Sequence, residues 1–67
     1  MNLNDYQSGN PIKIWHHKTG WVLGTIHDVG IDAATKSPVW LEIDFESRAS
    51  VVYLDSDGYS PLIAPPF

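Results

Sequence analysis

Hydrophobic and polar residues alternate most regularly between residues 39 and 46. Val39, Leu41, Ile43 and Phe45 fall on one side of this alternation, and Trp40, Glu42, Asp44 and Glu46 fall on the other. A period of two is typical of an antiparallel strand with one buried and one solvated face. We therefore predict a strand here whose aliphatic side faces the core.

Similar but shorter patterns predict further strands over residues 11–17, 21–29, 50–54 and 59–63. Pro11 opens the first of these, where a missing N–H is tolerated. The segments between them carry turn residues: Gly20 at residues 18–20, a longer loop over 30–38, and Gly58 at residues 55–58. Gly24, inside the second strand, indicates a bend or a close approach of another backbone.

Five short strands and no amphipathic helix predict an all-β fold, a small five-stranded barrel over residues 11–63. The polar residues 1–10 predict a flexible arm, and residues 64–67 a short tail. A chain of 67 residues makes at most one domain. So small a core is marginal, and without cysteine it must rely on compact packing or self-association.

Charge narrows the expected partners. Four basic against eight acidic residues give a net charge of −4, which disfavours nucleic acid and is easier to reconcile with a basic protein or peptide. The chain has no long apolar run for a membrane helix and no signal-peptide pattern at its N-terminus, so we expect a cytoplasmic protein with no membrane contact.

Strand parity directs all three tryptophans away from the core. If Ile12 and Ile14 face inward, Trp15 faces outward; the same reasoning places Trp21 and Leu23 outside, and Trp40 lies opposite its aliphatic neighbours. We expect Trp21 and Leu23 to lie beside Trp40 across the sheet, with Glu42 and Asp44 at the rim. Large rings edged by charge are typical of a binding surface. A one-residue slip would instead bury Trp21.

Three other groups of residues suggest chemistry. His17 and His27 would approach each other if the first two strands pair, and with Asp28 they would form a weak metal site; surface histidines are the alternative. Residues 55–58 resemble part of a calcium loop but also form an ordinary Asp-Gly turn. The carboxylates of Glu42, Asp44 and Glu46 share one exposed face, which does not separate their pKa values as acid–base catalysis requires. We expect no catalytic residue, no metal and no cofactor.

The order of these segments resembles the SH3-like barrel group, and in particular Tudor and KOW modules. The resemblance rests on residues 21–26, then 41–45, then 51–52 and 61–62, with Gly24 where such barrels bend their second strand. Tudor modules bind methylated Lys or Arg in an aromatic cage. That resemblance implies rings from Trp21, Trp40 and Tyr53 and a counter-charge from Glu42 or Asp44.

Residues 50–53 also resemble the valine-glutamine-isoleucine-tyrosine motif of the type II, plasmid-borne dihydrofolate reductases, which assemble four barrels around one pore. Tyr53 matches the family tyrosine and Val52 its isoleucine. Val51 stands where the family has its ligand-contacting glutamine, and a valine side chain cannot make that amide hydrogen bond. This resemblance implies an oligomeric reductase as a further possibility.

The sequence therefore favours a non-catalytic interaction module that contacts a protein partner or a second copy of itself. The expected binding residues are Trp15, Trp21, Leu23, Trp40, Glu42, Asp44 and Tyr53. The alternative from another class is a KOW-like module in which Trp15 stacks on a base and the basic side chains contact phosphates. Those side chains are Lys13, Lys18, Lys36 and Arg48.

Overall fold

The computed structural model describes residues 6–66. Its five strands are β1 (Pro11–His16), β2 (Gly20–Ile31), β3 (Pro38–Phe45), β4 (Arg48–Tyr53) and β5 (Ile63–Ala64). They form one antiparallel sheet in the order β4-β3-β2-β1-β5, and no helix occurs between residues 6 and 66. The predicted all-β class and the five strands are confirmed.

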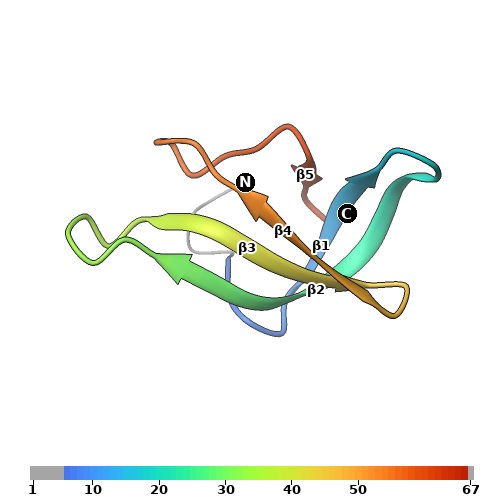
Figure 1. Cartoon of the computed structure of the whole chain (residues 1–67), viewed down its shortest axis with the longest axis horizontal. Coiled ribbons are helices and arrows are strands. Elements are labelled where there is room, and N and C mark those ends of the chain that lie inside the picture. Colours follow the sequence, from blue (N-terminus) through green and yellow to red (C-terminus); the bar gives the residue numbers. More distant parts are fainter. Residues whose placement is uncertain (1–5, 67) are drawn as a thin grey trace.

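The sheet is strongly twisted and curled, and it is open between β4 and β5 in the described part of the chain (Figure 1). The first half of β2 pairs with β1 and the second half with β3, so this 12-residue strand belongs to both halves of the sheet. Both edge strands still contribute to one core, through Val52 of β4 and Ile63 of β5. The curl therefore encloses a core without a closed ring of hydrogen bonds.

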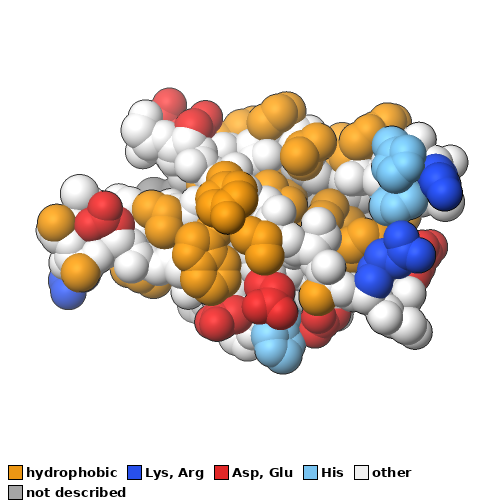
Figure 2. All heavy atoms as spheres, viewed as in Figure 1, with side chains coloured by type: hydrophobic (Ala, Val, Ile, Leu, Met, Phe, Trp, Pro, Cys, Tyr) orange, Lys and Arg blue, Asp and Glu red, His pale blue; other side chains and the backbone are white. Residues whose placement is uncertain are grey.

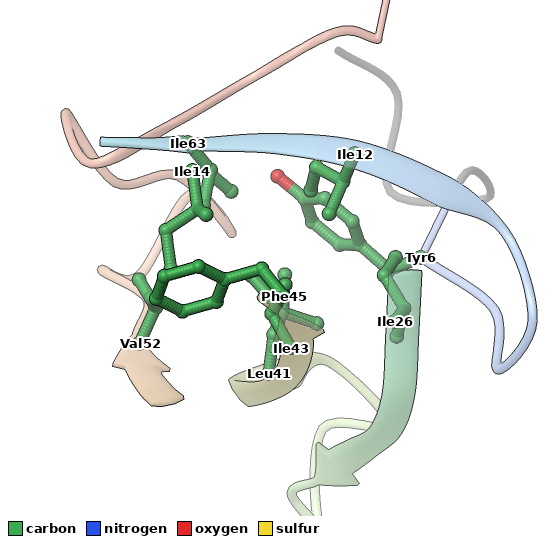
Figure 3. Packing of buried hydrophobic residues seen from close by; sticks show 9 residues of the cluster. All are labelled: Tyr6, Ile12, Ile14, Ile26, Leu41, Ile43, Phe45, Val52 and Ile63. Carbon is green, nitrogen blue, oxygen red and sulfur yellow. The ribbon is translucent and has the colours of Figure 1, made fainter. Parts of the chain in front are cut away.

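The core is built from the inward-facing residues of every strand. Its buried members are Tyr6, Ile12, Ile14, Ile26, Leu41, Ile43, Phe45, Val52 and Ile63. Figure 3 shows these side chains converging on one another from β1, β2, β3 and β4. All three tryptophans lie outside this cluster, as the parity of the strands predicted. Val39, predicted to face the core, is instead exposed at the start of β3, where the β2–β3 register shifts.

One close backbone approach and one tight turn explain how the sheet curls. A Cβ on Gly24 would lie 2.8 Å from Ile43 Cγ2 and 2.9 Å from the Asp44 carbonyl oxygen, closer than real Cβ atoms come. This confirms the close approach expected at Gly24. The β3–β4 connection is a two-residue turn, Glu46-Ser47, with φ of 49° and 62°. Positive φ at both central residues is the turn that matches strand twist in a tight hairpin.

Residues 6–10, expected to be part of a loose arm, are instead packed against the sheet. The Tyr6 ring is only 6% exposed and its hydroxyl donates to the Gly58 carbonyl oxygen at 2.9 Å. Gly9 N–H donates to Ile26 O, and Ile26 N–H donates to Asn10 O. Residues 1–5 of the expected arm lie outside the described residues.

The remaining boundaries differ by a few residues. The predicted strand over 59–63 is reduced to Ile63–Ala64, because residues 55–59 form a turn that the Asp55 carboxylate closes, accepting from the N–H groups of Asp57 and Tyr59. The Asp55 carboxylate accepts hydrogen bonds from backbone groups of its own turn, so the Asp-Gly turn is confirmed. Because residues 6–66 contain no helix, they contain no helical segment that could span a membrane.

Candidate functional site: two aromatic faces

The outer face of the sheet carries two separate groups of aromatic side chains. Trp15 and Trp21 are directly opposite each other on β1 and β2. Trp40 lies on β3, opposite Tyr53 of β4 on one side and Gly30 of β2 on the other. Trp21 lies near the start of β2 and Gly30 near its end, so most of that long strand separates the two groups.

The expectation that Trp21 and Leu23 lie beside Trp40 is therefore wrong. Consecutive strands do pair, as expected, but β2 is long enough to use different halves for its two neighbours. Its first half, with Trp21 and Leu23, faces β1. Only its second half reaches Trp40.

We call Trp15, Trp21, Leu23 and Leu62 the paired-tryptophan face. The two indoles meet edge to face, with ring centroids 5.5 Å apart and planes at 74°, the arrangement that the ring quadrupoles favour. Trp15 is 46% and Trp21 47% exposed, and Leu23 is 58% exposed. These rings are thus fixed against each other while nearly half of each remains in solvent.

Leu62 joins this face through the β1–β5 pairing. The Trp15 N–H donates to the Leu62 carbonyl oxygen at 2.8 Å, and the neighbouring pair is Ile14 with Ile63, both buried. Leu62 itself lies in the turn just before β5 and is 45% exposed. The backbone hydrogen bond therefore holds an exposed apolar residue next to Trp15, on the β5 side of β1.

Basic groups border the paired-tryptophan face. Lys13 is opposite Leu23, and residues 17–19, with His17 and Lys18, form the turn beyond the tryptophans. Arg48 Nη1 lies 3.5 Å from His16 Nε2 at the same end of the molecule. Figure 2 shows this gathering of basic and histidine side chains at one end of the chain. Lys18 and Arg48 therefore lie near one end of an otherwise acidic protein, and Lys13 lies farther along β1.

We call Trp40, Val51 and Tyr53 the Trp40 face. Tyr53 is 77% exposed, whereas the Trp40 indole is half-buried and lies directly over Gly30, filling the space that a Cβ there would occupy. Figure 2 shows hydrophobic side chains gathered over β3 and β4, with acidic groups along their border. Covering a strand glycine with a cross-strand aromatic ring stabilises the pair, so Trp40 has a role in the fold.

Of the two predicted rim carboxylates, Glu42 lies beside the Trp40 face, and Asp44 lies between the two faces. Asp44 is opposite Thr25, the next outward residue of β2 after Leu23. Glu42 is opposite Val51, and Asp44 is opposite Ala49. Asp44 also forms an ion pair with His27, whose Nδ1 lies 3.0 Å from Asp44 Oδ2. The proposed cage of Trp21, Trp40 and Tyr53 is not assembled, because Trp21 is on the other face.

The histidines do not form the expected pair either. His17 lies in the turn after β1, where its ring stacks on His16 at 4.7 Å, while His27 lies at the far end of the β1–β2 pairing, beside Asp44. Residues 6–66 contain no group of three or more His, Asp or Glu side chains that could hold a metal ion. His17 is in the turn of the β1–β2 hairpin and His27 is beyond its open end, so the length of the hairpin separates them.

Compared with known proteins, the chain matches no family model, no curated protein and no solved structure. The functional argument therefore depends on the geometry of the two faces. Leu62 and Val51 were not among the predicted binding residues. Leu62 could be recognised only through the pairing of β5 with β1, and Val51 only through its position at the edge of the sheet.

Proposed function

We propose that this chain is a non-catalytic interaction module whose paired-tryptophan face binds an apolar segment of a protein partner. The observation that carries the proposal is the edge-to-face pair of Trp15 and Trp21, each nearly half exposed beside the exposed Leu23. The core forms without them. Rigid aromatic rings that stay exposed and are not part of the core are typical of a recognition site.

The available free energy suits a moderate affinity. Covering the exposed half of one indole removes on the order of 100 Å² from water, worth roughly 2–3 kcal/mol before the cost of association. The two rings are already held against each other, so binding costs little further side-chain entropy. Together with Leu23 they support binding in the micromolar range.

The rim of this face indicates the charge of the partner. The net charge favours a basic partner, but Lys13 and Lys18 border the tryptophan pair. The nearer of the two predicted rim carboxylates, Asp44, lies beyond Leu23, opposite Thr25. Local charge governs the orientation of a bound segment more than net charge does. The site therefore favours an apolar segment with acidic flanks.

A KOW-like nucleic-acid module is the second candidate, because Lys13 is on the same side of β1 as the exposed Trp15 ring and Lys18 is in the turn that follows β1. In that function Trp15 stacks on a base while the basic groups contact phosphates.

Membership of the SH3-like group is part of the proposal, supported by the strand order and by the close approach at Gly24. A cytoplasmic location is proposed with it.

The test begins with selection of binders from a displayed peptide library on the immobilised protein. The dissociation constant of a selected peptide is then measured calorimetrically for wild type and for the Trp15→Ala/Trp21→Ala double variant. We expect at least a tenfold weakening, since the two rings supply several kcal/mol of contact. Tyr59→Ala is the matched control, because Tyr59 is 51% exposed but lies in the 55–59 turn, and it should leave affinity unchanged.

Salt separates the two candidates. Peptide binding through apolar rings, with acidic flanks near only Lys13 and Lys18, should weaken modestly between 50 and 500 mM salt, whereas binding through several phosphate contacts loses affinity steeply. A single-stranded oligonucleotide that binds more tightly than any selected peptide, with a steep salt dependence, would support the nucleic-acid function. Selected peptides that bind the double variant as well as wild type would refute the proposed face.

A further inference from the structure

Among residues 6–66, no strand pairs with the outer edge of β4, and the register of β4 against β3 fixes which of its backbone groups point outward. Leu54 N–H donates to Val39 O at 2.9 Å, in line with the β3–β4 register in which Tyr53 is opposite Trp40. Alternate residues of an antiparallel strand direct their N–H and C=O groups to opposite sides. The even-numbered residues therefore bond to β3, and Ala49, Val51 and Tyr53 direct theirs away from the sheet.

The opposite edge of the sheet is protected, and β4 is not. β5 has only two residues, Ile63–Ala64, and prolines lie close on both sides of it, at positions 61, 65 and 66. Short strands and proline are common ways of blocking an edge. β4 has six residues, RASVVY, with no proline, no lysine and no register shift against β3. A regular apolar edge of this kind is a template for another strand.

We propose that a second copy of this chain pairs with β4, antiparallel, about a two-fold axis at Val51. In this register Val51 is opposite Val51 of the second copy, and Ala49 is opposite its Tyr53. All the outward-directed groups of Ala49, Val51 and Tyr53 are then matched, giving about six backbone hydrogen bonds. The nearest other registers that keep outward residues opposite each other have the two-fold axis at Ser50 or Val52. Each of these registers leaves some of the outward N–H and C=O groups without a partner.

A second copy fits this edge because the strand is complementary to itself. A two-fold axis gives the same contacts on both copies and closes the assembly as a dimer. The side chains of Val51 and Tyr53, 49% and 77% exposed, meet on the same side of the extended sheet. Charge agrees: Arg48 precedes the strand's apolar residues and Asp55 follows them. Antiparallel pairing places Arg48 opposite Leu54 of the second copy, one residue from its Asp55, whereas parallel pairing in register would place like charges opposite each other.

Disulfide trapping tests the proposal directly, because the chain contains no cysteine. In the proposed register the two Val51 Cα atoms are about 5.5 Å apart, within the range that a disulfide spans. Oxidised Val51→Cys should form a covalent dimer of twice 7.5 kDa. Ala49→Cys is the matched control on the same edge, since its two cysteines would be separated by about 14 Å. We expect at least about fivefold more covalent dimer for Val51→Cys.

Sedimentation velocity on the cysteine-free chain gives the second readout. Wild type and Val51→Thr, which keeps the N–H and the branched shape, should form dimers, and Val51→Pro, which removes the outward N–H, should sediment as a monomer with an unchanged β spectrum. Val51→Lys serves the same purpose if the proline variant does not fold. A wild-type monomer at 100 μM, or equal trapping of both cysteine variants, would overturn the proposal. So would a monomer whose residues 1–5 protect the β4 amides from hydrogen exchange.

Discussion

The two aromatic faces use tryptophan for different purposes, although both lie on the outer side of one sheet. Trp40 is half-buried and covers Gly30, so part of its ring replaces the side chain that the glycine lacks. Trp15 and Trp21 cover each other and leave nearly half of each ring in water. The comparison teaches that an outward-facing tryptophan is evidence for binding only after its structural role is known.

The largest expected effect is that of Gly30→Val. A side chain at this position would overlap the Trp40 indole, so either the ring or the β2–β3 pairing must move. We expect a loss of at least about 3 kcal/mol in the free energy of unfolding. Urea denaturation followed by circular dichroism measures this loss. Thr25→Val, on the outer side of the same strand, is the control and should change stability little.

Solvent quenching gives the next largest effect. Variants that keep a single tryptophan, the other two being replaced by phenylalanine, report on one ring each. Acrylamide should quench Trp15 or Trp21 about twice as strongly as Trp40, because the first two are nearly half exposed and Trp40 is shielded on the Gly30 side. Equal quenching of all three rings would remove the distinction between the two faces.

The smallest effect concerns the polar strip between the two faces. Asp44 and His27 form an ion pair whose side chains are 50% and 60% exposed. Exposed pairs contribute little, so Asp44→Asn should change the free energy of unfolding by less than about 1 kcal/mol. It should also leave peptide binding at the paired-tryptophan face unchanged. A tenfold loss of binding would show that this strip belongs to the same site.

Alternation along the strands was enough to predict the all-β fold and the outward direction of each tryptophan. It could not predict which outward residues meet, because that depends on how the length of β2 is divided between β1 and β3. Leu62 joins the tryptophan pair through a contact between residues distant in sequence. Tyr6 gave no periodic signal, since it is a single aromatic residue in a polar segment, yet it is buried.

The most direct test of the central claim compares the unfolding free energies of two variants by urea denaturation. Trp40→Ala uncovers Gly30 and should cost roughly 2–3 kcal/mol. The Trp15→Ala/Trp21→Ala double variant removes two rings that are each nearly half exposed, so it should cost less per ring than Trp40→Ala. A double variant that costs more than twice as much as Trp40→Ala would mean that the pair stabilises the sheet and does not serve mainly to bind a partner.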